Sequence, residues 1–297
     1  MFGIDDCNFP KKNSRAFKKM KNKTLKRKHN RSYKYPTVLL FPHSLGQSNL
    51  GTEKAPQYLN KYINKKTHQV KNIKDTGNLF RNINALYQAN QGASGKIINI
   101  GGDHSMSIAT IADTLNKYPT AKVIYFDAHA DLNTYKSSKS KHYHGMPLSF
   151  VTGLDQDSRF GFISNKLPFE NLLYIGSRCW DPYEVNEAYK RNIKFIMPDE
   201  INNDFPGALN KILNFVGNAP VHVSFDVDSI DPKYIPSTGT PVKNGIELPK
   251  AKLILDSLNR GNLVKLDITE LNMSLGTGPD GVKSGKNTER LFHNFIK

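Results

Sequence analysis

Cysteine, tryptophan and long apolar runs are scarce in this chain of 297 residues. The two cysteines, Cys7 and Cys179, exclude both a framework of several disulfides and a metal site built from thiolates. No apolar stretch approaches the ~20 residues that a membrane-spanning helix needs, so we expect no membrane partner. The length is enough to bury a substantial core, in one large domain or two small ones.

Acidic residues are also few, since 26 Asp and Glu stand against 42 Lys and Arg and give a net charge of +16. The chain up to Pro36 carries twelve Lys or Arg and two Asp, a net charge of +10, which leaves +6 for the remainder. The stretch Lys11–Lys34 has little apolar content, as is typical of disordered segments. We therefore divide the chain into a basic, disordered N-terminal arm, residues 1–35, and a folded domain, residues 36–297.

The arm permits several interpretations. Lys26–Arg31 is rich enough in basic residues to act as a nuclear signal or to contact nucleic acid, although a solvated tail explains it equally well. The arm lacks the apolar core of a secretory signal, and its lysine-rich composition with Asp5 and Asp6 is a weak match to a mitochondrial presequence. We expect a cytoplasmic protein, with nuclear or mitochondrial targeting left open.

Three short clusters of Asp and His each follow an apolar run that predicts a buried strand. They are Gly-Gly-Asp-His-Ser at 101–105, Asp-Ala-His-Ala-Asp at 127–131 and Ser-Phe-Asp-Val-Asp at 224–228. One such cluster alone is as well explained by ordinary turn and cap residues. Three of them favour a common site, because functional groups in open α/β sheets gather beyond the carboxyl ends of the strands. Two His and four Asp gathered there predict a metal site.

The residue types favour two divalent ions. Four carboxylates in one cleft would repel one another and take up protons unless cations neutralised them. Two divalent ions supply the four positive charges that balance Asp127, Asp131, Asp226 and Asp228. Mixed imidazole and carboxylate ligands suit Mn²⁺, with Fe²⁺, Co²⁺ and Zn²⁺ as competitors.

At these clusters the chain resembles the ureohydrolases, the binuclear manganese enzymes that include arginase, agmatinase and formiminoglutamase. The resemblance runs from about Thr37 to the C-terminus. It implies a three-layer α/β/α fold with a central, mostly parallel β-sheet and two Mn²⁺ per subunit. All six ligand positions of the family are filled. The resemblance assigns His104 and Asp131 to one ion, His129 and Asp228 to the other, and Asp127 and Asp226 to both.

Within that family the chain is most similar to the arginases. The segments that carry this similarity are 41–47, 144–150, 177–184, 238–241 and 267–272. The implied reaction is metal-dependent hydrolysis of L-arginine to L-ornithine and urea by a metal-bridging hydroxide. Agmatinases diverge in the second and third segments, so an agmatinase or another guanidino-acid hydrolase is the second hypothesis. A catalytically weak metal binder or nucleic-acid binder is the third.

The resemblance also implies roles for single residues. Glu270 would pair with the substrate guanidinium, Thr240 would orient it, and His144 would move a proton to the departing amine; the ligand Asp131 completes the catalytic set. Asn133 and Ser140 would contact the α-carboxylate. Asp181, with Glu184 beside it, would contact the α-amino group.

Two segments depart from the arginase pattern. His142 stands where an Asn is common, and residues 242–247 replace a glycine-rich continuation. Both departures concern substrate affinity and rate, whereas the metal ligands are intact.

The resemblance also concerns assembly. Family members are usually oligomers, and we expect a trimer.

Past the arm, strands and helices alternate, which favours a parallel sheet. We predict strands at Thr37–Phe41, Lys96–Ile100, Lys122–Phe126, Leu172–Ile175, Lys194–Ile196, Val221–Asp226 and Leu263–Ile268. We predict helices at Ala55–Asn64, Asn78–Asn90, Ser105–Lys117, Pro182–Lys190, Pro206–Phe215, Pro249–Leu258 and Thr288–Phe295. His222 lies within an apolar strand and is interpreted as a core histidine.

Overall fold

The computed structural model describes residues 35–297. The basic arm lies outside the described residues apart from its last residue, and so do the targeting and nucleic-acid hypotheses attached to it. The strands are β1 Thr37–Phe41, β2 Gln69–Asn72, β3 Ile97–Gly101, β4 Lys122–Phe126, β5 Leu172–Ile175, β6 Lys194–Ile196, β7 Val221–Asp226 and β8 Leu263–Thr269. The α-helices are α1 Ala55–Leu59, α2 Leu79–Gln91, α3 Ser107–Lys117, α4 Pro147–Thr152, α5 Pro182–Lys190, α6 Pro198–Asn203, α7 Phe205–Val216, α8 Leu248–Asn259 and α9 Gly278–Ile296.

The eight strands form one sheet in the order β2-β1-β3-β8-β7-β4-β5-β6. Every neighbouring pair in this sheet is parallel. The predicted α/β class is therefore confirmed, and the sheet is parallel throughout. The four central strands, β3, β8, β7 and β4, are the strands that the Asp and His clusters and Glu270 follow. Their carboxyl ends lie at one edge of the sheet.

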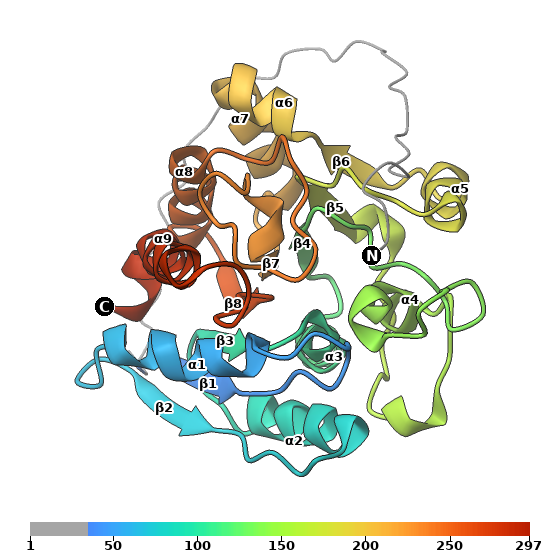
Figure 1. The fold of residues 1–297 in the computed structure, drawn as a ribbon. Helices are drawn as coiled ribbons and strands as arrows, with labels where there is room; N and C mark the ends of the chain where they lie inside the picture. The colour runs from blue at the N-terminus through green and yellow to red at the C-terminus, as the bar shows by residue number, and fades with distance from the viewer. Residues whose placement is uncertain (1–34) are drawn as a thin grey trace.

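Helices cover both faces of the sheet, which gives the predicted three layers (Figure 1). Alternate residues of a strand point to opposite faces, and here both sets are apolar. In β1, Val38 and Leu40 belong to the core on the face covered by α1, α8 and α9, whereas Leu39 and Phe41 belong to the core on the face covered by α2 and α3. The remaining helices divide in the same way, with α6 and α7 on the first face and α4 and α5 on the second.

The structure differs from the predicted elements in a few places. Strand β2 and helices α4 and α6 were not predicted, and α9 begins ten residues before the predicted Thr288. Three glycines in the early turns of α9 weaken its helical signal. At one of them, Gly285, an added Cβ would lie 2.5 Å from the Tyr58 ring, so close packing explains this glycine. The predicted helix 55–64 is α1 followed by a short 3-10 helix, Asn60–Tyr62.

Among residues 35–297, no helix combines the length and the apolar character that crossing a membrane requires.

Candidate metal centre

The three predicted clusters meet at the carboxyl edge of the central strands. His104 begins a 3-10 helix directly after β3, and Asp127, His129 and Asp131 follow β4. Asp226 is the last residue of β7, and Asp228 lies in the next turn. All of these side chains are buried except His129, whose side chain is 27% exposed. The name edge cluster is used below for the set His104, Asp127, His129, Asp131, Asp226 and Asp228.

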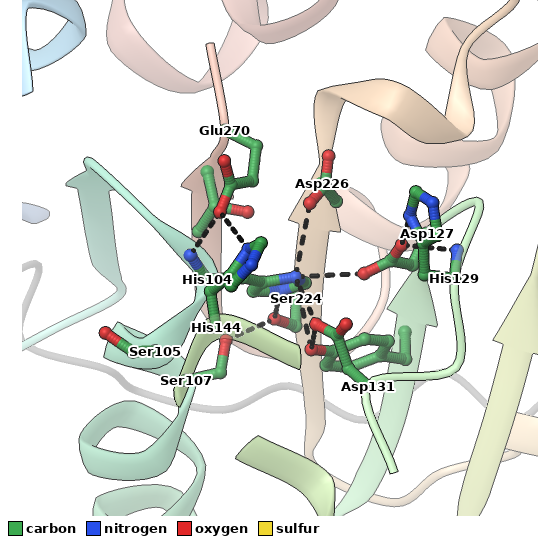
Figure 2. A network of polar contacts seen from close by, with 12 residues as sticks. His104, Ser105, Ser107, Asp127, His129, Asp131, His144, Ser224, Asp226 and Glu270 are labelled. Carbon is green, nitrogen blue, oxygen red and sulfur yellow. Dashed lines mark hydrogen bonds and ion pairs between the residues drawn. The ribbon is translucent and has the colours of Figure 1, made fainter. Parts of the chain in front are cut away.

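His104 faces three carboxylates (Figure 2). Its Nδ1 lies 2.9 Å from Oδ2 of Asp127, 3.1 Å from Oδ2 of Asp131 and 3.3 Å from Oδ2 of Asp226. On the other side of the ring, Nε2 lies 2.9 Å from the hydroxyl oxygen of Ser224. A proton on Nε2, donated to Ser224, leaves the Nδ1 lone pair directed at the carboxylates. Metal-binding histidines are commonly oriented by such a contact.

His129 faces the other side of Asp127. Its Nδ1 lies 3.0 Å from Oδ2 of Asp228 and 3.5 Å from Oδ1 of Asp127. Ligand atoms of His104, Asp127 and Asp226 lie within 4.8 Å of one another, as do those of Asp127, His129 and Asp228. Asp127 therefore belongs to two groups, each able to hold one ion.

Backbone donors hold the outer oxygens of these carboxylates. Oδ1 of Asp228 accepts from Ala128 N–H at 2.9 Å, and Oδ1 of Asp226 accepts from Asp228 N–H at 2.7 Å. In both residues the second oxygen is the one that faces a histidine. The local turns thus direct one oxygen of each carboxylate into the cluster.

The cluster fits a bound cation better than it fits a set of internal hydrogen bonds. Oδ2 of Asp127 is fully buried and has no hydrogen bond of acceptable geometry, although it lies 2.9 Å from His104 Nδ1. Burial, and then the charges of Asp131 and Asp228, raise the pKa of Asp127 to about 6. Burial and the same kind of repulsion raise the pKa of Asp226 well above its usual range. Divalent cations bound to imidazole and carboxylate would relieve this repulsion.

The predicted guanidinium partner lies next to this cluster. Oε1 of Glu270 accepts from the backbone N–H of His104 at 2.8 Å and lies 3.4 Å from Nδ1 of His144. Oε2 accepts from Nε2 of Gln47 at 2.7 Å. Burial lowers the pKa of His144, but the carboxylates of Glu270, Asp131 and Asp103 together outweigh it, and the net shift is upward. Glu270 and His144, predicted from separate motifs, are therefore neighbours.

The predicted amino-acid contacts are only partly brought together. Nδ2 of Asn133 donates to Oδ2 of Asp181 at 2.8 Å, so these two side chains form a pair. Both oxygens of Glu184 accept backbone N–H groups, from Leu132 and Asn133 on one side and from Asp181 on the other. Glu184 therefore fixes the backbone at Asn133 and at Asp181, the two residues whose side chains form the pair.

The other residues predicted to contact substrate lie further out. Ser140 and Thr240 are exposed, and within the described part of the chain no hydrogen bond joins either to Asn133, Asp181 or Glu270. The hydroxyl of Ser140 accepts from His142 N–H at 3.3 Å. The His142 ring is partly exposed, 5.9 Å from that of His144 between centroids.

Arg178 links the altered segment 242–247 to the backbone of Asp228 through hydrogen bonds. Its guanidinium donates to the carbonyls of Val242 and Lys243 at 2.7 and 3.0 Å, and to that of Asp228 at 2.9 Å. The segment is thus held against the backbone of a candidate ligand despite its unusual sequence.

Three residues that contact the proposed ligands or Glu270 were not assigned a role from the sequence: Tyr125, Ser224 and Gln47. The Tyr125 hydroxyl donates to Oδ2 of Asp131 at 2.8 Å and lies 3.1 Å from Nδ1 of His104, on which its ring stacks at 4.6 Å. The alternation in β4 places Tyr125 on the same side as Asp127, and Ser224 likewise precedes Asp226 by two residues. That spacing was a usable signal for both. Gln47 lies in the motif 41–47, but nothing in that motif indicates a contact with Glu270.

His222 was interpreted from the sequence as a core histidine. This prediction is confirmed, since His222 has no exposed surface.

Comparisons with known proteins agree with this arrangement. A model of the arginase family matches residues 36–296. The arginase of Neurospora crassa is 36% identical over 224 residues, 71% of this chain and 63% of that protein. Human Arginase-1 is 30% identical over 282 residues, 83% of this chain and 88% of that protein. The crystal structure of Entamoeba histolytica arginase in complex with L-ornithine superposes with a TM-score of 0.80 at 25% identity, covering 88% of this chain and 98% of that one.

A parallel α/β fold with two adjoining His and Asp groups defines a candidate binuclear metal centre. The chain belongs to the arginase family, whose members depend on metal ions. It spans about half to two thirds of the length of the fungal arginases among these relatives.

Proposed function

We propose that this protein hydrolyses L-arginine to L-ornithine and urea at a centre of two Mn²⁺ ions. The observation that carries the proposal is Asp127, which is shared between two His and Asp groups, beside the Glu270 and His144 pair. The family relationship to proteins named arginase supports the same reaction. The L-ornithine bound to the Entamoeba histolytica protein agrees with it as well.

The six side chains of the edge cluster are the proposed ligands. His104 and Asp131 would hold one ion, His129 and Asp228 the other, and Asp127 and Asp226 both. When bound, two divalent cations supply a Lewis acid that activates water near neutral pH. Four carboxylates balance their charge, and imidazole with carboxylate is a donor set that suits Mn²⁺.

The neighbouring residues would bind the substrate and move its proton. The Glu270 carboxylate would accept charge-assisted hydrogen bonds from the guanidinium and hold its central carbon toward the ions. His144 lies beside that carboxylate and would deliver a proton to the departing amine, since imidazole titrates near the working pH. Thr240, on the exposed loop 239–241, would join this group when substrate is bound.

The other end of the substrate would select arginine over agmatine, which lacks the carboxylate. The pair of Asn133 and Asp181 offers an amide and a carboxylate, which match an α-carboxylate and an α-amino group. Ser140 would complete the carboxylate site. Leaving one such polar group without its partner costs about 1–3 kcal/mol, which is enough to discriminate between the two substrates. Assembly into a trimer is a further part of the proposal, based on family membership.

Urea release from L-arginine and from agmatine, each with and without added Mn²⁺, tests the proposal. We expect manganese-dependent release from arginine and little from agmatine. Metal analysis of the same samples should give two Mn²⁺ per chain. Release from agmatine alone would reassign the substrate, and a folded protein with two ions that acts on neither would contradict the proposed function.

A further inference from the structure

Gln47 is a buried amide that contacts Glu270 and has no role in the reaction described above. It lies in the loop after β1, is 9% exposed, and donates from Nε2 to Oε2 of Glu270 at 2.7 Å. The two residues are 223 positions apart in the chain. We propose that Gln47 is a positioning residue, which orients the Glu270 carboxylate so that it presents one free acceptor site on each oxygen to a guanidinium. This inference rests on the proposed function of Glu270.

The number of donors around Glu270 carries the argument. A carboxylate has about four acceptor sites, two on each oxygen. The backbone N–H of His104 occupies one site on Oε1, and the Gln47 amide occupies one on Oε2. His144 lies 3.4 Å from Oε1, which is longer than a normal hydrogen bond. One site on each oxygen therefore remains, and a guanidinium that binds through two parallel N–H groups takes one site on each.

The backbone of Glu270 also needs support from its surroundings. Glu270 has φ of +62°, a left-handed conformation that is uncommon for a residue with a side chain. Its N–H donates to the carbonyl of Gly102 at 2.9 Å, which anchors the main chain but leaves the side chain able to rotate. Gln47 and the His104 N–H are the contacts that fix the carboxylate plane.

The Gln47 loop is itself held by the site. Gly46 N–H donates to Oδ2 of Asp103 at 2.7 Å, and the Gly46 carbonyl accepts from His144 N–H at 3.2 Å. A Cβ at Gly46 would lie 2.6 Å from Oδ1 of Asp103, so a side chain would push the loop away. On the other side, a Cβ at Gly239 would lie 3.3 Å from Oε1 of Gln47. The Gln47 amide thus lies between the Glu270 carboxylate and the loop that carries Thr240.

Gln47→Met tests the inference because it keeps the length of the side chain and removes the N–H donor. Calorimetric titration of the metal-free protein with L-arginine and with L-ornithine measures binding without turnover. We expect the affinity for arginine to fall about 10- to 100-fold, as for loss of a hydrogen bond to a charged group. The affinity for ornithine, which has no guanidinium, should stay near that of the wild type.

A matched control is Gln91→Met on helix α2, which removes the hydrogen bond from Gln91 Nε2 to Asp113, a residue outside the edge cluster. It should leave both affinities and urea release unchanged. Equal losses for arginine and ornithine in Gln47→Met would show a general structural defect and overturn the inference. An unchanged arginine affinity would overturn it as well.

Gln47→Glu adds a readout that a passive packing role would not move. Two carboxylates in hydrogen-bond contact cannot both ionise readily, so the acid side of the pH–rate profile should move to higher pH. Activity should recover as pH rises. An unshifted profile contradicts the inference. If the wild type binds arginine but releases no urea, the proposed function fails while the calorimetric comparison still decides the role of Gln47.

Discussion

The four central strands carry two buried polar clusters, which differ in how the charges of their carboxylates are balanced. The edge cluster lies beyond the strand ends. The interior cluster lies within the sheet and against α3, and comprises Asn99, Thr110, Thr114, His222 and Asp267. Both contain buried Asp and His, and His129 of the edge cluster is the one partly exposed member. In the interior cluster, however, Asp267 accepts from Asn99 at 2.7 Å, from His222 at 2.9 Å and from the Thr110 hydroxyl.

The difference lies in how the carboxylate charge is balanced. Burial raises the pKa of Asp267, but His222, Thr110 and the charge of Lys265 together outweigh it, and the net shift is downward. In the edge cluster, carboxylates face one another and the pKa of Asp127 is raised to about 6. Buried charges are stable when they are paired and hydrogen-bonded. The interior cluster meets this condition with its own residues, whereas in the edge cluster Oδ2 of Asp127 has no hydrogen bond and the proposed cations would complete the balance.

Asp127→Ala should have the largest effect, because it removes the carboxylate common to both groups. We expect loss of bound Mn²⁺ and of urea release, beyond the roughly 10- to 100-fold that changes around a metal's ligands cost. The metal-free protein should become more stable, since one of several repelling charges is gone. Metal analysis, urea assays and denaturation in chelator measure these effects, and Asp226→Ala should behave similarly.

The control for both variants is Asp199→Ala, at an exposed position on α6. Full activity in Asp127→Ala or Asp226→Ala would refute the shared-ligand assignment.

Changing the pH should affect the two clusters in opposite ways. A carboxyl whose pKa is raised on folding contributes stability below its unfolded pKa of 3.8, and this contribution is lost as pH rises through about 6. The metal-free protein should therefore be less stable at pH 7 than at pH 5. With Mn²⁺ the order should reverse, because protons and cations compete for the same oxygens.

The lowered pKa of Asp267 predicts that the interior cluster contributes stability above 3.8 and loses it only as pH falls below that value. It should not change between pH 5 and 7. Urea denaturation at both pH values, with chelator and with Mn²⁺, measures the difference. A chelated protein that gained stability from pH 5 to pH 7 would be inconsistent with repulsion in the edge cluster.

Asp267→Ala should reduce the free energy of unfolding by about 3–5 kcal/mol, because it leaves buried donors on Asn99, Thr110 and His222 without an acceptor. Mn²⁺ content per folded chain should stay the same. Denaturation of the metal-free protein measures the loss. Asp256→Ala, which removes a helical ion pair with Lys252 at 2.7 Å, should cost no more than about 1 kcal/mol. Comparable losses in the two variants would remove the distinction between interior and surface charge.

Tyr125→Phe should have the smallest effect, a reduction in Mn²⁺ affinity of about 10- to 100-fold. It removes the hydroxyl that donates to Asp131 and leaves the ring stacked on His104. Calorimetric titration with Mn²⁺ measures the change. Tyr174→Phe is a matched control, since that buried hydroxyl donates to the Ala130 carbonyl at 2.6 Å and, within residues 35–297, makes no hydrogen bond to a candidate ligand side chain. Unchanged affinity in Tyr125→Phe would show that the hydroxyl does not orient Asp131.

The central part of the fold was predictable from the sequence because buried parallel strands are apolar on both faces. The edge strand β2, Gln69–Asn72, has Val70 as its sole apolar residue, and its other residues are exposed. A strand of this kind has no local signal and is recognised only by its pairing with β1. The start of α9 was missed because packing against Tyr58, rather than helix propensity, accounts for its glycine.

Within the site, the clustering of the proposed ligands was predictable because short spacing and strand ends place them together. The contacts of Gln47 and Tyr125 were not predicted. The partner of Gln47 is distant in sequence, and a tyrosine in an apolar strand is first interpreted as core. For Ser140 and Thr240 the reverse holds, since a contact was predicted from the sequence and none is observed in the described part of the chain. Their motifs suggest substrate contact, but both residues are exposed and neither is hydrogen-bonded to Asn133, Asp181 or Glu270 within the described residues.

His104 contacts both halves of the site, with its ring facing the carboxylates and its backbone N–H bonded to Glu270. An ion held by His104 and Asp131 would also fix the position of the His104 N–H that donates to Glu270, so we expect binding of the cation and binding of a guanidinium to be thermodynamically linked. Such linkage is reciprocal. If both bind as proposed, arginine should raise the equilibrium affinity for Mn²⁺ by the same factor by which Mn²⁺ raises the affinity for arginine.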